Sequence, residues 1–249
     1  MSGPVARLVR AEFRLMTRDP LVLTFVLVFP IVTMLIIGGS FSADDADAFS
    51  GVDPSDWYVA SYVTVVIAAT GLVMVPVHLA SYRERGVLRR FAAAGFPRWS
   101  FGIAQLAVGL GTTALASAVL LAVAAPVYGV PSLHEGWRVL AALVLGAVAF
   151  VSAGVLLGSV LPSARSAQAV GLILFFPSFL LGAGGPPPAV MGDALRDIAE
   201  VLPLSVVTTA AREPWLGIAP AGGSLVVVAV LAVVGVLAAA RRSALGARG

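Results

Sequence analysis

The sequence predicts an all-α polytopic membrane protein with six transmembrane helices, an N-terminal amphipathic interfacial helix and a short outer helix pair before the last span. Hydrophobic residues make up 59% of the chain and charged residues only 12%, about half of what soluble domains carry, and the mean hydropathy is +0.98. Six stretches without formal charge are each long enough for one membrane-spanning helix and too short for two. We therefore expect residues 1–249 to form a single transmembrane domain.

Basic and apolar side chains fall on opposite sides of a helical wheel over residues 1–20. The basic side carries Arg7, Arg10, Arg14 and Arg18, and the apolar side carries Val5, Leu8, Val9, Phe13 and Met16. This pattern is typical of an amphipathic helix in the membrane interface. Asp19 and Pro20 end it, because a residue before proline avoids the helical conformation. A solvated basic tail attracted to anionic lipid is the alternative.

The charge-free stretches define the expected spans. The first runs from Pro20 to Ala43, whereas the apolar core of a signal peptide has only about 7 to 15 residues. We expect a retained span over residues 21–41, kinked at Pro30. The other five are expected near residues 57–79, 101–125, 139–160, 167–184 and 220–240.

The distribution of charge predicts the orientation. Thirteen of the sixteen arginines lie in residues 1–20, 80–100, 161–166 and 241–249, so the positive-inside rule makes both termini cytoplasmic. Ten of the thirteen acidic residues lie on the other side, and five of them crowd the first outer loop, residues 44–56. We interpret that loop as solvated rather than as a cation site, because the spacing of a Ca²⁺ loop is absent.

Several kinds of chemistry are excluded by residue type. The chain has no cysteine, which excludes disulfides, cysteine-ligated zinc and thiol catalysis. All sixteen basic residues are arginine, so a standard P-loop, which needs a lysine, cannot form. No charged residue is expected near a bilayer centre, and His78 is expected at the interface rather than in a proton relay. The energy for any transport must therefore come from outside these helices.

Two further segments carry structural signals. Gly154 and Gly158 form a GxxxG pattern that would let a neighbouring helix approach closely. In the connection from Gly184 to Pro220, a run of glycine and proline ends the fifth span. Apolar residues then recur at helical spacing over residues 190–202, and a second short helix can run from residue 204 to 212. Both are too short to span, so we expect a half-buried pair at the outer face.

The densest polar patch of the chain, Tyr82–Phe91, lies between the second and third spans. Four arginines and one glutamate exclude it from hydrocarbon. A helix continuing from Ser81 to Phe91 would place the arginines on one side and Glu84 among apolar residues on the other. That arrangement favours docking to a protein, and a patch that only enforces topology is the alternative.

The motifs of this patch resemble those of the permease family of ABC-2 type exporters. In that family the loop after the second span reads roughly Arg-Glu-Arg/Lys-Gly-Thr/Val-Leu-x-Arg-Leu and then Ala-Thr-Pro-Leu-Pro/Ser. The stretch Arg83–Phe91 matches the first part, and Ala93–Pro97 matches the second with Ala94 and Gly95 in place of Thr and Pro. The family's Pro-Leu, seven residues, then Arg is matched by Pro203, Leu204 and Arg212, and Phe176-Pro177 with the following stretch to Gly182 is similar to its fifth span.

The resemblance implies the membrane subunit of an ATP-driven exporter, in which two six-helix permeases, identical or different, pack together and two ATPase subunits dock below. It implies that this chain binds no cofactor and no nucleic acid, and that ATP and Mg²⁺ are bound by the partner subunit. It also implies a place in the cell membrane and an amphiphilic substrate such as a drug, natural product or lipid. Drug resistance is an expected role. The ATPase-coupling residues would be Arg83, Glu84, Arg85, Gly86, Leu88, Arg89 and Arg90.

Other functions stay open at this point. A related permease for cell-envelope polysaccharide export is one alternative, although a large aromatic-rich channel signature is absent. A membrane scaffold or sensor that transports nothing is another. A membrane-embedded enzyme is disfavoured because the spans lack paired His, Asp or Glu residues and a Ser/His pair.

Overall fold

The computed structural model describes residues 20, 23–87, 90, 93, 98–218 and 223–245, and in this part every element of regular structure is a helix, with no strand. The interfacial helix expected over residues 1–20 lies outside this part except for Pro20. The elements are η1 Leu23–Val28, α3 Phe29–Gly38, η2 Ala43–Phe49, α4 Pro54–Ala68, η3 Ala69–Met74, α5 Val75–Glu84, α7 Arg98–Tyr128, α8 Gly136–Val160, α9 Ala164–Gly182, η4 Pro188–Val190, α10 Asp193–Val201, α11 Pro203–Leu216 and α12 Ser224–Leu245. The all-α polytopic class is confirmed.

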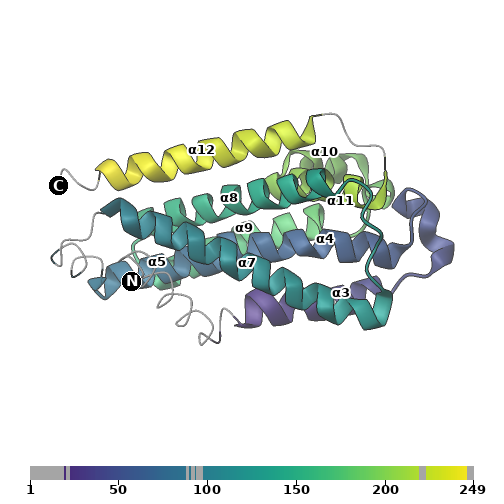
Figure 1. Cartoon of the computed structure of the whole chain (residues 1–249), viewed down its shortest axis with the longest axis horizontal. Helices are drawn as coiled ribbons and strands as arrows, with labels where there is room; N and C mark the ends of the chain where they lie inside the picture. The colour runs from purple at the N-terminus through teal and green to yellow at the C-terminus, as the bar shows by residue number, and fades with distance from the viewer. Residues whose placement is uncertain are drawn as a thin grey trace.

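The long helices lie side by side along the longest axis of the molecule, and α10 and α11 lie at one end of it (Figure 1). The connection from α3 to α4 is at the same end, whereas α5 and α12 finish at the opposite end. We call the end with α10 and α11 the outer end and the opposite end the cytoplasmic end, after the orientation expected from the charges.

Five described helices are long and apolar enough to cross a membrane: Pro54–Glu84, Gly102–Tyr128, Gly136–Val160, Ala164–Gly182 and Ser224–Arg242. They correspond to the second to sixth expected spans. The first expected span is represented by Thr24–Gly38, which is followed after a bend of 109° by Ala43–Phe49. The described helices thus give five spans, or six when this bent pair counts as one.

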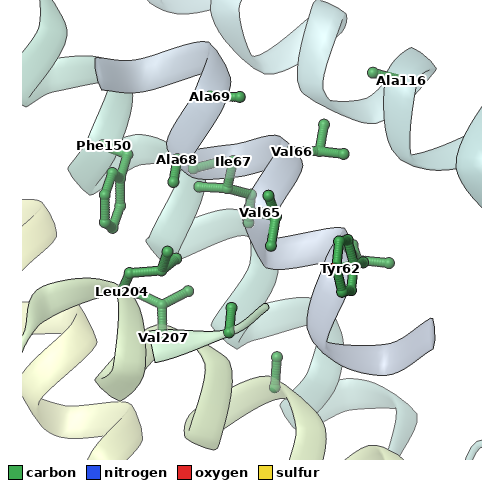
Figure 2. Packing of buried hydrophobic residues seen from close by; sticks show 14 of the residues in the cluster. Tyr62, Val65, Val66, Ile67, Ala68, Ala69, Ala116, Phe150, Leu204 and Val207 are labelled. Carbon is green, nitrogen blue, oxygen red and sulfur yellow. The ribbon is translucent and has the colours of Figure 1, made fainter. Parts of the chain in front are cut away.

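The second span forms the centre of the bundle. Almost every side chain from Pro54 to Met74 is buried, because α3, α7, α8, α9 and α11 all pack around it. Figure 2 shows Tyr62, Val65 and Ile67 of this span together with Leu204 and Val207 of α11. By contrast, α12 leaves valines such as Val226 and Val233 exposed, as expected of a helix that faces lipid.

Two segments of the first and second spans are π-helical rather than α-helical. Both η1 and η3 end two residues before a proline, Pro30 and Pro76 respectively. Proline has no N–H to donate to the carbonyl one turn earlier, so the helix loosens just before it. The kink expected at Pro30 therefore takes the form of this change of helix type. The two π-helical segments also pack against each other.

Candidate functional site

The polar patch at the cytoplasmic end begins where α5 stops. The helix expected to continue from Ser81 to Phe91 is interrupted: α5 ends at Glu84, and Gly86 adopts a left-handed conformation with φ of 67°. The N–H groups of Arg85 and Gly86 donate to the carbonyl oxygens of Ser81 and Arg83, both at 3.1 Å. This closure is typical of a glycine that ends a helix, because glycine adopts positive φ without steric cost. One helical wheel therefore does not extend across the patch.

Arg83 joins two helices at this end. Its Nη1 donates to the carbonyl oxygens of Leu161, at 2.9 Å, and Gly158, at 3.1 Å. Both carbonyls belong to the final turn of α8, where backbone oxygens have no helical donor. A cation is also favoured at the negative end of the helix dipole. Arg83 thus fastens the end of α5 to the end of α8.

The neighbouring charges of the patch face outward. Glu84, Arg85 and Arg90 are exposed, so Glu84 is not turned toward an apolar side as the helical wheel predicted. The physical reason is that the helix ends at Glu84 itself. Leu88 and Arg89 lie outside the described residues. Arg83 is exposed as well, so the described patch presents one carboxylate and three guanidiniums, of which that of Arg83 is already bonded to α8.

Glycines of α8 and α9 let the second span approach closely just above the patch. A Cβ on Gly154 would meet the carbonyl oxygen of Gly71 in η3, and one on Gly171 of α9 would meet that of Leu72. A Cβ on Gly158 would come within 2.8 Å of the carbonyl oxygen of Pro76 in α5. The pattern of Gly154 and Gly158 thus faces the second span, and backbone lies against backbone along this seam.

Acidic residues at the outer end serve as helix caps. The Asp53 carboxylate accepts from the backbone N–H of Ser55 at 2.8 Å and caps α4, and Asp45 accepts from the N–H of Ser42 at 2.9 Å. Caps of this kind satisfy donors that a helix start leaves free. Among the described residues, no three Asp, Glu or His side chains come together as a metal site.

The two short helices of the outer end differ in burial. Most side chains of α10 are exposed and only Ala199 is buried, whereas α11 packs against α4, α8, α9 and α12. The buried residues of α11 are Leu204, Val207, Thr208, Ala210, Ala211, Arg212, Pro214 and Trp215. The expectation of a half-buried pair therefore needs correction: α10 lies on the surface, and α11 enters the bundle. Pro203 begins α11, and Leu204 is fully buried beneath it.

Arg212 of α11 is a buried cation, 7% exposed. Its guanidinium carbon lies 3.5 Å from the centroid of the Trp57 ring, and its Nη1 donates to the hydroxyl of Ser61 at 3.1 Å. Burial lowers the pKa of Arg212 to about 10, although the nearby negative charge of Glu213 raises the pKa and so limits the shift. Its Nε has no hydrogen-bond partner in the described part of the chain. Arg212 thus remains charged at neutral pH and is held by a π face and one neutral hydroxyl.

The last turn of α11 is anchored to the loop between α7 and α8. The indole Nε1 of Trp215 donates to the carbonyl oxygen of Pro131 at 3.2 Å, and the backbone N–H of Glu135 donates to that of Pro214 at 2.9 Å. The His134 ring nitrogen Nδ1 also lies 3.0 Å from the carbonyl oxygen of Trp215. These contacts fix the C-terminal end of α11 and leave its N-terminal end to side-chain packing.

Aromatic rings link the first, second and fifth spans. Phe29 of α3 packs edge-to-face on Phe175, Phe176 and Phe179 of α9, with centroids 5.1 to 6.1 Å apart. Tyr62 of α4 lies 6.0 Å from Phe179. Rings at these separations attract one another beyond their burial alone. The spacing of aromatic residues within each span did not predict that these rings meet.

The fold and these sites define a multi-pass α-helical membrane protein with a charged patch at one end and a helix that enters the bundle at the other. The family model for the ABC-2 type transporter matches residues 5–214. The chain belongs to the ABC-2 type transporter family, and in that family it is a membrane subunit rather than the ATPase. No curated protein matches the chain.

Proposed function

We propose that the chain is the permease subunit of an ATP-driven exporter that moves an amphiphilic small molecule or lipid outward. The match to the ABC-2 family over residues 5–214 carries the proposal. The absence of lysine, which a P-loop requires, assigns ATP hydrolysis with its Mg²⁺ to a separate nucleotide-binding subunit. Both termini and the patch around Glu84 then lie in the cytoplasm.

The patch at the end of α5 is the surface on which the ATPase subunit docks. Glu84, Arg85 and Arg90 are exposed within the same short segment and offer charges of both signs to a partner. Arg83 and Gly86 hold this surface in place, Arg83 by joining α5 to α8 and Gly86 by ending the helix. A push on the patch is thereby passed to two helices at once.

The substrate path lies between this permease and a second one, identical or different. The exposed face of α9 supports this assignment, because Ile173, Phe176 and Leu180 follow one another at helical spacing and remain accessible. An apolar face of this kind suits an amphiphile better than a sugar chain. Transport of drugs or natural products would make the pair a resistance determinant.

Export from vesicles that contain the permease and its ATPase subunit tests the proposal. Glu84→Ala should leave membrane insertion intact but lower both ATPase co-purification and export by at least fivefold, because the exposed carboxylate is lost from the docking surface. Glu200→Ala is the matched control, since Glu200 is an exposed glutamate on α10. Unchanged export in the Glu84 variant would refute the docking role, and a chain that retains no ATPase subunit would be a scaffold or sensor.

A further inference from the structure

A line of polar contacts joins α11 to α4 inside an otherwise apolar interface. The hydroxyls of Thr64 and Thr208 are hydrogen-bonded at 2.7 Å, and one turn further the guanidinium of Arg212 contacts Ser61 and Trp57. Ser61, Thr64 and Thr208 are fully buried. We call these five residues the α4–α11 seam. Hydroxyls and a cation are unusual in such a place, because apolar side chains would bury at lower cost.

The ends of α11 separate it from the neighbouring helices. Leu202 before Pro203 is extended, with ψ of 131°, and Gly217 after Leu216 has a left-handed φ of 71°. Both residues interrupt the helical backbone, and a few residues of this kind can act as hinges that absorb large changes in φ and ψ. The helix is therefore a short rod bounded by a break on each side.

The faces that α8 and α9 present to α11 carry glycine. A Cβ on Gly146 of α8 would come within 2.5 Å of Val207, and one on Gly182 of α9 within 3.0 Å of the Ser205 hydroxyl. Contacts of a side chain with bare backbone lack the interlocking of large side chains, so they oppose sliding weakly. Because the C-terminal end of α11 is anchored to the loop between α7 and α8, the polar seam on α4 is the contact that holds the rest of the helix in place.

Arg212 makes the closed position of α11 reversible. While the seam is closed, the cation has lost its water, and the contacts with Trp57 and Ser61 and the nearby charge of Glu213 offset only part of that loss. When α11 moves away from α4, the guanidinium regains hydration, which offsets the contacts that are broken. A methionine at this position would bury well and would gain nothing on opening.

From this geometry we propose that the α4–α11 seam is the outer gate of the permease, and that Arg212 is the positioning residue that keeps the gate able to open. The proposal rests on the function proposed above. In the transport cycle, α11 separates from α4 at Thr64 and Ser61 and lets the substrate leave at the outer end, then returns to the seam.

A reversible cross-link tests the gate. The chain has no cysteine, and the hydroxyls of Thr64 and Thr208 lie close enough for a disulfide between thiols at these positions. In vesicles with the ATPase subunit, oxidation of the Thr64→Cys/Thr208→Cys chain should lower export at least tenfold, and reduction should restore it. The reduced protein is its own control. Equal export in the oxidised and reduced states would overturn the proposal.

Hydrogen exchange on the purified permease gives a second test that needs neither export nor the ATPase. Arg212→Met should slow exchange of the α11 amides at least threefold relative to the wild type and leave those of α8 unchanged. The same variant should export less while melting at an equal or higher temperature, whereas loss of a merely structural contact would lower both. Exchange in α11 that is unchanged or faster would overturn the role of Arg212. Wild-type vesicles that fail to export would instead count against the proposed function, and the exchange measurement would still decide the gate.

Discussion

The Nη1 atom of Arg83 lies 2.9 Å from the carbonyl oxygen of Leu161, at the point where α8 ends. This contact changes the interpretation of the cytoplasmic patch, because one of its four arginines, although exposed, also joins two helices of the fold. The patch combines a structural residue, Arg83, with exposed neighbours that remain available for docking. Mutations within it should therefore fall into two groups.

Arg83→Ala should destabilise the chain, and Arg85→Ala should not. Loss of two charge-assisted hydrogen bonds from a partly solvated site is expected to cost about 1 kcal/mol in the free energy of unfolding. Arg85 is exposed and serves as the control. Thermal unfolding in detergent measures the difference, and faster exchange of the last α8 amides should accompany it. Equal melting of both variants would contradict the bridge.

Gly154→Ala should destabilise the bundle by about 2 to 3 kcal/mol, because the added methyl group would press on the carbonyl oxygen of Gly71. Gly102→Ala is the matched control in another helix, where nothing lies within 4 Å of the added atom. Alanine favours a helix over glycine, so the control should be stabilised by up to about 1 kcal/mol. The two changes are chemically identical. A lower unfolding midpoint for Gly154→Ala and a higher one for Gly102→Ala, each relative to the wild type, would confirm the close approach.

Arg212→Met should change how stability depends on pH. Because burial lowers the pKa of Arg212 from its ordinary value to about 10, the folded chain releases this proton before the unfolded chain does as the pH rises. The penalty is fully present below pH 10, about 3 kcal/mol by the size of the shift, and it fades as the pH rises from 10 toward the ordinary pKa of arginine. The variant's advantage in melting temperature should thus shrink between about pH 10 and pH 12. A difference that stays constant over this range would argue against a buried charge.

Single cysteines can establish the orientation of this cysteine-free chain. Ser132→Cys lies in an exposed part of the loop between α7 and α8, and Ala93→Cys lies in the exposed part of the patch connection. In intact cells, a membrane-impermeant maleimide should label the first and spare the second, which should react only after permeabilisation. The reverse pattern would place the termini outside and would invalidate the positive-inside argument.

Five long apolar helices of the described chain fall near the second to sixth expected spans, because span boundaries depend on charge, which is read residue by residue. The helical wheel predicted the patch incorrectly. It treated residues 81–91 as one helix, although a glycine such as Gly86 after a long helical segment is a common stop signal. The partner of Arg83 could not be foreseen, because it is a backbone carbonyl 78 residues away and any residue type supplies one.

Arg212 shows a different limit. The resemblance identified the residue by its spacing from Pro203, but an arginine in a polar outer connection normally indicates solvent exposure. A signal was present in its surroundings: Thr208 lies one turn before Arg212, and Ser61 and Thr64 lie one turn apart in a span without charge. Two such polar pairs at helical spacing indicate a polar interface, although the sequence does not say that they meet.

The π-helical segment η3 changes which neighbouring helices the two parts of the second span face. A π turn holds about one residue more than an α turn, so the helix beyond it is rotated by roughly 100° relative to an uninterrupted one. Accordingly, α4 packs on α3, α7, α8 and α11, and α5 packs on α8 and α9. The same span thus presents two differently oriented faces, and α8 contacts both of them. A tilt of α5 therefore acts on α8, which also contacts α4.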